Sequence, residues 1–446
     1  PMRIPFDYGA IGADADWRSR LHWPISHRHG FDLATAICAT MLEQLAAEDD
    51  ACRRDAFTLA IGHLSTTAVY LGQVAATLDR AALDQGAHPP ITFAGTTKAF
   101  AQLHDGQTFE DDGRIAFDAS KLAVPGFQML RRIARIHTWT PSRQPLRLLR
   151  SVLRPQALGL SHNGLMIAYA ASRGEAIGFE HAATLYARIA ATRKPQDIDL
   201  IGDTVERLIG RVIAICALRN ASYEARLRQL LRERFNAQLQ LAHADLEAAS
   251  RLPTPRRLLA GTGGYWPTRV LSIAALRKGV QVDRFEHGIQ AGLLCVTEPI
   301  RIAELCVSSR FFLPSNALRE RLHAAITGAP PSTIPVLEHH PAGLDLVPAF
   351  APRTRRPGAG PRVLYGPSIL LGERQFTPPM LTDVVHWDHQ LRMVEMLSSM
   401  PIELLLRPHP EGLFSGRRHP LNDLHRTDPR RYETIVDEAD VMVFDY

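Results

Sequence analysis

The first apolar segments of the chain alternate with polar and amphipathic ones in the order strand, loop, helix, strand. An apolar run at 57–61 is followed by a polar stretch at 62–67. Helical spacing over 68–83 and a second apolar run at 91–94 come next. This is the order of a βαβ unit, in which two parallel strands flank a crossover helix. We therefore predict strands at 57–61 and 91–94, with a loop at 62–67 on the carboxyl side of the first strand.

Helical periodicity dominates residues 125–250. Two segments, 200–219 and 225–249, carry apolar residues at spacings of three and four, which is typical of helices with one buried face. The second segment also carries four arginines, Arg226, Arg228, Arg232 and Arg234. A solvated helix face is the ordinary origin of such charges, and a nucleic-acid or membrane-surface helix is the alternative. We predict a large helical insertion at about 125–250.

A second strand, loop, helix and strand follow. The strand at 257–260 leads into a glycine-rich loop, and Pro267 suits the first turn of the next helix. Gly279 ends that helix, because glycine readily takes the left-handed conformation that follows a helix. The next strand runs from Val280 to Phe285.

Residues 328–362 are rich in Pro, Gly, Ala and Arg, which indicates a linker. The strands predicted after it are 363–365, 402–406 and 441–444, and the helices are 386–399 and 432–438. We predict an N-terminal α/β domain over 1–345, a linker over 346–361 and a C-terminal α/β domain over 362–446. About 85 residues are few for a nucleotide-binding domain, so we expect this last domain to be truncated.

Composition narrows the class of protein without assigning a function. The 446 residues are 46% apolar and 22% charged, with a net charge of +5, as in an ordinary globular protein. These values exclude a disordered chain and a small disulfide scaffold, and the charge is too small to indicate nucleic-acid binding. Five cysteines without a CxxC pair, no apolar run near the roughly 20 residues of a membrane span, and no signal-peptide pattern predict a cytoplasmic protein with free thiols.

The loops that follow parallel strands are the first candidates for binding and catalytic residues, because ligands of open α/β sheets bind outside the carboxyl ends of the strands. Gly261, Thr262 and Gly263 form such a loop before a helix. Glycine lets a ligand approach the backbone, and a helix N-terminus favours an anion. The dinucleotide fingerprint G-x-G-x-x-G is incomplete, because Trp266 takes its last position, so a simple tight turn is the alternative.

Glu286, His287 and Gly288 follow the strand that ends at Phe285. A carboxylate beside an imidazole can supply a base or a nucleophile. Gly288 lets a substrate pass close to the loop. We take Glu286 and His287 as candidate catalytic residues and Gly288 as a candidate binding residue, with a helix cap and a structural histidine as the alternative.

Polar residues also follow the strands of the predicted C-terminal domain. Arg407 and His409 lie in a loop stiffened by two prolines, and an arginine with a histidine suits a phosphate. The candidate binding residues are Gly366, Ser368, Arg407, His409, Pro410, Glu411, Gly412 and Asp445. A rigid turn with surface charges is the alternative for the Arg407 loop.

Signatures of other chemistries are missing from the sequence. It contains no Walker loop, no G-x-S-x-G and no H-E-x-x-H motif. Glu338, His339 and His340 lie in the proline-rich stretch, where we expect them to be solvated. A metal-dependent mechanism is therefore not indicated.

Three segments, in order, resemble a bacterial surface-polysaccharide transferase of the GT-B glycosyltransferase architecture. They are 261–264 leading into 285–288, then 406–410, then 439–446, so the resemblance covers 257–446. Within that group the chain is similar to the β-Kdo transferases of capsule and lipopolysaccharide, which use CMP-Kdo, and less closely to the CDP-glycerol glycerophosphotransferases. The resemblance implies two Rossmann-type domains facing a cleft, an acceptor-side domain first and a nucleotide-sugar-binding domain second.

The resemblance also implies roles for residues. The His-Pro segment of these families contacts donor phosphate, a role that falls on His409 and Pro410 here. Some Kdo transferases carry an acidic-Asp-Gly segment, where this chain has Glu286, His287 and Gly288. The carboxylate role therefore passes to Glu286, or His287 acts as a base.

The activity implied is metal-independent transfer of a sugar, Kdo, from a CMP-activated donor to an oligosaccharide or lipid-linked glycan such as lipopolysaccharide O-antigen or capsule. No cofactor beyond the nucleotide sugar and no nucleic-acid partner are implied. The enzyme is expected in the cytoplasm, or peripherally on the inner face of the cytoplasmic membrane. The alternatives are a CDP-glycerol or CDP-ribitol phosphotransferase of teichoic-acid type and a non-catalytic GT-B-like module.

Overall fold

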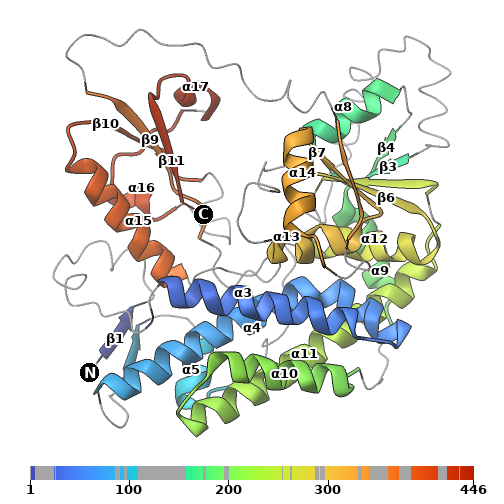
Figure 1. The fold of residues 1–446 in the computed structure, drawn as a ribbon, viewed down its shortest axis with the longest axis horizontal. Helices are drawn as coiled ribbons and strands as arrows, with labels where there is room; N and C mark the ends of the chain where they lie inside the picture. The colour runs from blue at the N-terminus through green and yellow to red at the C-terminus, as the bar shows by residue number, and fades with distance from the viewer. Residues whose placement is uncertain are drawn as a thin grey trace.

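The computed structural model contains helices, two larger parallel sheets and one parallel strand pair among the residues that it describes. It describes residues 2–5, 25, 27–85, 91–94, 98–108, 157–161, 163–173, 177–194, 200–253, 255–261, 264–286, 291, 297–329, 334–340, 360–370, 383–409, 419–430 and 432–445. Figure 1 shows long helices across the lower part of the view, with one sheet above them on each side. The α/β class predicted from the sequence is confirmed.

The helical layer is built from segments far apart in the chain. Its helices are α3 (His27–Ala46), α4 (Ala51–Gln85), α5 (Lys98–Asp105), α10 (Asp203–Cys216) and α11 (Ala221–Ser250). The predicted helices at 200–219 and 225–249 are α10 and α11, so those two predictions are confirmed. Helix α11 packs along α4, and together with α3 and α10 they form the largest apolar core. A separate strand pair, β1 (Met2–Pro5) and β2 (Ile91–Ala94), is parallel.

The larger sheet has six parallel strands in the order β4-β3-β5-β6-β7-β8. The strands are β3 (Ala157–Gly159), β4 (Ile177–Phe179), β5 (Arg257–Ala260), β6 (Gln281–Phe285), β7 (Arg310–Leu313) and β8 (Val336–His339). The helices between them are α8 (Gly164–Arg173), α9 (Ala182–Thr192), α12 (Trp266–Arg277), α13 (Glu298–Ala303) and α14 (Asn316–Ala325), with a 3₁₀ helix, η2 (Leu305–Val307).

Helices cover both faces of this sheet. On β5, Leu259 faces a cluster with α8, whereas Leu258 and Ala260 face a cluster with α9 and α12. This alternation follows from the two-residue period of a strand. The strand order reverses between β3 and β5, which is the switch point of a doubly wound sheet. The carboxyl ends of β3 and β5 therefore mark the crevice where such sheets ordinarily bind ligands.

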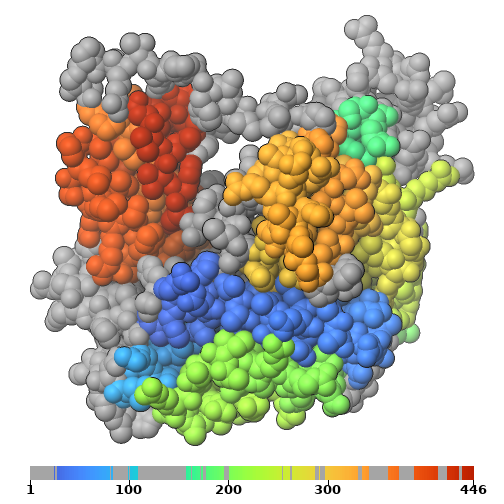
Figure 2. Space-filling model, in the orientation of Figure 1, coloured from blue at the N-terminus to red at the C-terminus, as the bar shows by residue number. Residues whose placement is uncertain are grey.

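The smaller sheet has three parallel strands in the order β10-β9-β11. Its elements are β9 (Arg362–Gly366), α15 (Asp383–Ser398), β10 (Glu403–Leu406), α16 (Leu421–Leu424), α17 (Tyr432–Val436) and β11 (Val441–Phe444). Trp387 and Leu391 of α15 are buried with Tyr365 of β9, while Leu364 packs on the other side against Ile435. Figure 2 shows these orange and red elements on one side, above the blue helices.

Buried polar side chains tie the larger sheet to the helical layer. The fully buried guanidinium of Arg269 in α12 donates to the carbonyl of Leu59 in α4 at 2.9 Å and to that of Ile302 in α13 at 2.7 Å. Asp245 of α11 accepts the indole N–H of Trp266 at 2.8 Å and the hydroxyl of Tyr186 at 2.7 Å. Because buried polar groups are costly when unpaired, these contacts fix how α9 and α12 lie on the helices beneath.

One predicted βαβ unit is wrong. Residues 57–61 and 62–67 belong to the single 35-residue helix α4, not to a strand and a loop. Every residue from 59 to 69 is buried, because the helix packs among neighbours on all sides. An apolar run can mark a helix buried all round as well as a strand. Thr66 donates its hydroxyl to the Gly62 carbonyl at 2.8 Å, a bond made along the helix. The strand at 91–94 is present, but its partner is β1.

Five short strands lie where the sequence predicts none: β1, β3, β4, β7 and β8. β3 and β4 fall inside the range predicted to be a helical insertion, and β8 falls inside the proline-rich stretch. The expectation that Glu338 and His340 are solvated linker residues is therefore wrong: Glu338 pairs with Arg310 at 3.1 Å, and His340 bonds the Ser172 hydroxyl at 3.0 Å. Most of the predicted linker, 346–359, and residues 125–156 lie outside the described residues.

The remaining predicted elements agree with the structure. The strand at 257–260, the helix that follows it and the strand ending at Phe285 are β5, α12 and β6. The C-terminal strands and helices are β9, α15, β10, α17 and β11. Gly279 has φ +70°, as the end of α12 requires. The solvated face expected for α11 is only partly present, because Arg234 is buried and donates to Gln102 at 2.7 Å.

Candidate functional site

Loops from all three strands of the smaller sheet meet at its carboxyl edge. Gly366 ends β9 and residues 367–368 follow it, residues 407–409 follow β10, and Asp445 follows β11. The amide of His409 donates to the Pro367 carbonyl at 3.0 Å, and the amide of Ser368 donates to Asp445 Oδ1 at 2.7 Å. Parallel pairing brings these carboxyl ends together. The sheet thus joins Ser368, His409 and Asp445, which lie up to 77 residues apart in sequence.

Asp445 is the centre of this cluster. Its buried carboxylate accepts the Ser368 amide, His386 Nε2 at 2.8 Å and Gln390 Nε2 at 2.7 Å. Burial alone opposes ionisation, but the bond and charge of His386, with the bonds from Gln390 and Ser368, outweigh it. The pKa of Asp445 therefore lies below its ordinary value, and the carboxylate is ionised at neutral pH.

Ser368, His386 and Asp445 do not form a proton relay. Ser368 Oγ lies 3.2 Å from His386 Nε2, and the same nitrogen lies 2.8 Å from Asp445 Oδ2. A Ser-His-Asp relay needs the serine and the carboxylate on different ring nitrogens. Since Nε2 carries the hydrogen that Asp445 accepts, it cannot also take the proton of Ser368. The arrangement suits binding and orientation rather than an activated serine.

His419 completes the support beneath Ser368. It is buried, its Nδ1 accepts the Leu421 amide at 3.2 Å, and its Nε2 donates to the Ser368 carbonyl at 3.3 Å. Burial lowers the pKa of His419 to about 4, so the ring is neutral at pH 7. Burial also lowers the pKa of His389, although Asp445 opposes that shift. Neutral imidazoles thus surround the His386–Asp445 pair.

Arg407 is bonded to the loop that precedes α17. Its Nε donates to the carbonyl of Arg430 at 2.9 Å, and its Nη1 donates to the carbonyl of Pro408 at 3.3 Å. Asp428, which accepts bonds from Arg430, lies close enough for Arg407 to lower its pKa further. The side chain therefore has a structural task, and its predicted phosphate contact stays a prediction.

Two predicted binding glycines have a packing reason to be glycine. A Cβ on Gly366 would lie 2.7 Å from the Phe444 ring, and one on Gly261 would lie 2.5 Å from the Cβ of Asn163. The amide of Gly261 also donates to Ser161 Oγ at 2.8 Å. Both contacts lie at strand ends, so glycine here allows neighbouring loops to approach closely.

Asn163 ties the loop after β3 to the carboxyl end of β6 in the larger sheet. Its Nδ2 donates to the carbonyls of Phe285 and Glu286 at 3.2 and 3.1 Å, and its Oδ1 accepts the Met166 amide at the start of α8. The Glu286 amide donates to the Phe312 carbonyl at 2.9 Å. Glu286 therefore has a fixed backbone at the carboxyl end of β6, with a half-buried side chain.

The predicted site residues divide into two groups and an undescribed remainder. Ser368, Asp445, Gly366, His409 and Arg407 lie at the carboxyl edge of the smaller sheet, and Gly261 and Glu286 lie at that of the larger one. Outside the described residues are Thr262, Gly263, His287, Gly288, Pro410, Glu411 and Gly412.

The sequence analysis missed several polar residues at these edges. His386 and Gln390 are polar residues four apart on a helix whose neighbouring positions, Trp387 and Leu391, are buried. That pattern could have marked a buried polar contact. Asn163 and His419 had no comparable signal, because their partners come from distant loops.

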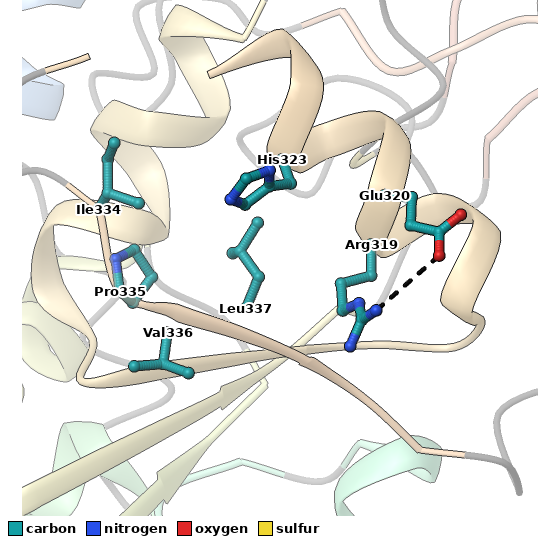
Figure 3. A pocket seen from close by; sticks show the side chains of 7 residues that line it. All are labelled: Arg319, Glu320, His323, Ile334, Pro335, Val336 and Leu337. Atoms are coloured by element: carbon teal, nitrogen blue, oxygen red, sulfur yellow. Dashed lines mark ion pairs between the residues drawn. The ribbon is translucent and has the colours of Figure 1, made fainter. Parts of the chain in front are cut away.

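A hollow among the described residues lies elsewhere. A space of about 520 Å³ lies between α14 and the start of β8, lined by Arg319, Glu320, His323 and residues 334–337. Figure 3 shows these side chains, with an Arg319–Glu320 ion pair at 3.9 Å. Because residues 334–337 include the start of β8, the hollow adjoins the amino end of that strand, away from the carboxyl ends where the predicted residues lie. It does not coincide with either candidate site.

Among the described residues, no group of three or more His, Cys, Asp and Glu side chains is placed to hold a metal ion. No helix in the described ranges is both long and apolar enough to cross a membrane. No family model, curated protein or solved structure matches the chain.

Proposed function

We propose that the protein is a glycosyltransferase that moves Kdo from a CMP-activated donor to a bacterial surface glycan such as lipopolysaccharide O-antigen or capsule. One observation carries the proposal. Segments 366–368, 407–409 and the residue Asp445 meet at one carboxyl edge of a parallel sheet. Two of the three segments that resemble the Kdo transferases thus contribute to one place, where open sheets bind nucleotides.

The proposal assigns the two sheets different tasks, in a GT-B arrangement with a cleft between them. The smaller sheet binds the donor: His409, exposed beside the 366–368 loop, contacts the phosphate, and Asp445 holds Ser368 in place. The larger sheet receives the acceptor, with Glu286 at the end of β6 as the group that acts on it. The peripheral inner face of the cytoplasmic membrane is the place where such an acceptor is found.

The chemistry requires little beyond charge stabilisation and a base. The acceptor hydroxyl loses its proton to Glu286 or His287 as its oxygen bonds to the anomeric carbon. The bond from that carbon to CMP breaks, and CMP leaves with the electron pair. Donors aimed at the phosphate stabilise the charge that develops on the leaving group. CMP carries a single phosphate, so a metal is less necessary than for a diphosphate donor.

Release of CMP from CMP-Kdo tests the proposal. His409→Ala is expected to abolish release while leaving the melting temperature unchanged, because this side chain is exposed. His323→Ala, an exposed histidine of α14, is the matched control and is expected to behave as wild type. Normal turnover by His409→Ala would refute the assigned role.

Thermal shifts with CMP, CDP, UDP and GDP test the donor class, since a bound ligand raises the melting temperature. The proposal expects a shift with CMP. Stabilisation by UDP alone would remove every cytidine donor. A larger shift with CDP, with glycerol phosphate transfer from CDP-glycerol, would favour the teichoic-acid type of enzyme. Absence of both donor hydrolysis and transfer in the purified chain would favour a non-catalytic module.

A further inference from the structure

We propose that the outer edge of β8 binds a second copy of the chain, so that the larger sheets of two molecules join through antiparallel β8 strands. This surface lies away from both candidate sites, and its role is independent of the function proposed above. Three features of the edge carry the proposal: its outward main-chain groups, its exposed apolar start and the pair of opposite charges on the neighbouring helix α14.

The outer edge of β8 presents main-chain groups that pair with no other described strand. β8 is the last strand of the larger sheet and pairs with β7. The amides of Val336 and His340 donate to carbonyls on the β7 side, both at 3.1 Å. Because a strand has a period of two, the amides and carbonyls of Leu337 and His339 point to the opposite side. Such a row of main-chain groups is a template for one more strand.

The start of β8 is apolar and exposed. Val336 is 61% exposed, more than any other large apolar side chain among the described residues. A space of about 520 Å³ lies between this start and α14 (Figure 3). Proteins ordinarily protect a sheet edge with a lysine or a proline within the strand. β8 contains neither, and its acidic side chain, Glu338, is paired with Arg310 of β7. The edge is therefore open to pairing.

The charge of Glu338 selects the register of the two β8 strands. If Leu337 paired with His339 of the second copy, Glu338 would face Glu338 of that copy, and like charges directly opposite each other are destabilising. If Leu337 pairs with Leu337 of the second copy, Glu338 faces Val336 instead. Hydrogen bonds then join the two Leu337 residues, and each His339 amide donates to the Pro335 carbonyl of the other copy.

The charges of α14 are self-complementary across the two-fold axis of such a dimer. Arg319 and Glu320 line the hollow beside β8 (Figure 3), and their ion pair within one chain is long, at 3.9 Å. In a two-fold interface each contact occurs twice, so Arg319 of each copy faces Glu320 of the other. An acidic or a basic peptide would be attracted by one of these charges and repelled by the other. A second copy therefore fits this surface better than a peptide of either charge.

Sedimentation equilibrium of the full chain over a range of concentrations tests the proposal, and we expect a monomer–dimer equilibrium. His339→Pro removes an outward amide and leaves the bonds to β7, since proline is tolerated on an edge strand when its missing N–H faces outward. Each dimer loses two hydrogen bonds, so we expect its affinity to fall by roughly tenfold or more. His339→Ala keeps the amide and is the matched control, which should dimerise as wild type. Equal melting temperatures of the two variants exclude misfolding.

Exchanging the charges of Arg319 and Glu320 tests whether the partner is a second copy. Arg319→Glu alone sets glutamates against each other across the axis, and Glu320→Arg alone sets arginines against each other. Each single change should weaken the dimer by about three- to tenfold. The double variant restores opposite charges and should restore the affinity.

Three results would overturn the proposal. The first is a monomer at every concentration up to the solubility limit. The second is a dimer that His339→Pro leaves intact, because its interface would lie elsewhere. The third is a double variant as weak as the single ones, because Arg319 would then not face Glu320 of the second copy.

Discussion

Replacing Asp445 by asparagine tests whether this carboxylate holds the carboxyl edge of the smaller sheet together. The change keeps the shape of the side chain and removes its charge. It also replaces an acceptor oxygen by an NH₂ group. The wild-type carboxylate accepts from Ser368, His386 and Gln390 at 2.7 to 2.8 Å, and all three donors come from elements other than β11.

The loss of stability follows from the number of hydrogen bonds that the asparagine side chain can still accept. If its oxygen keeps the Ser368 amide, its NH₂ faces the donors of His386 and Gln390. If the side-chain amide is flipped by 180°, its NH₂ group faces the Ser368 amide instead. In either case at least one buried donor loses its hydrogen bond. The hydrogen bonds that remain are no longer made to a charged acceptor. Hydrogen bonds to charged groups contribute about 1.5–3 kcal/mol each, so we expect a loss of about 2–4 kcal/mol.

Hydrogen exchange of backbone amides measures this loss locally. The Ser368 amide and the amides of β9 should exchange about 30- to 1000-fold faster in Asp445→Asn, since about 1.4 kcal/mol is tenfold in an equilibrium. Asp428→Asn is the matched control, because Asp428 accepts from Arg430 in an exposed turn of the same unit. Exposed ion pairs contribute little, so this control should leave exchange in β9 nearly unchanged.

The pH dependence provides a further check on the same variant. The pKa of Asp445 lies below its ordinary value, so its stabilisation is present above that ordinary value and is lost only as the pH falls through the lower, native pKa. The difference in local free energy of unfolding between wild type and Asp445→Asn should therefore be the same at neutral and at mildly acidic pH. It should become smaller in strong acid. Exchange rates within about fivefold of wild type at neutral pH would refute the central role of Asp445.

Two further predictions concern the larger sheet and the helical layer. Gly261→Ala should destabilise the chain by about 1–3 kcal/mol in urea unfolding, because its Cβ would lie 2.5 Å from that of Asn163. Gly210→Ala, with open space around its Cβ inside α10, should stabilise the chain slightly instead. Burial lowers the pKa of His63 to about 3. Between this pKa and the ordinary pKa of histidine, the ring is protonated in the unfolded chain and neutral in the folded chain. Stability should therefore fall as the pH drops below about 6.5, by up to roughly 1.4 kcal/mol per pH unit, and His63→Gln should remove that part of the slope.

Sequence reasoning succeeded where local signals mark both ends of an element. Pro267 opens α12 and Gly279 closes it with φ +70°, and strands of four or five residues lie on either side. It failed for residues 57–67, because α4 buries apolar and polar side chains alike, among them His63, Ser65 and Thr66, so polarity there does not follow the period of a helix. β3 and β4 have three residues each, which is too short for an alternating pattern to be recognised.

The candidate site was predictable in position but not in its internal contacts. The rule that ligands bind at the carboxyl ends of parallel strands located Ser368 and Asp445 correctly at one edge. It could not show that His386 and Gln390 reach Asp445, because that contact depends on how α15 docks through Trp387 and Leu391. Nor could it show that Arg407 is bonded to the Arg430 carbonyl, since that carbonyl lies in a loop 23 residues away.

The carboxyl edges of the two sheets are held together by different kinds of side chain. At the larger sheet, the loops are held by neutral groups: Asn163 bonds backbone carbonyls, and Ser161 accepts the Gly261 amide. At the smaller sheet, the loops are held by the ionised carboxylate of Asp445, which accepts from Ser368, His386 and Gln390. An ionised carboxylate repels an anion, so the proposed donor phosphate needs the hydrogen-bond donor that the exposed His409 supplies, whereas a hydroxyl acceptor needs only a base such as Glu286. Under the proposed function, the anionic donor therefore lies with His409, and the acceptor hydroxyl with Glu286.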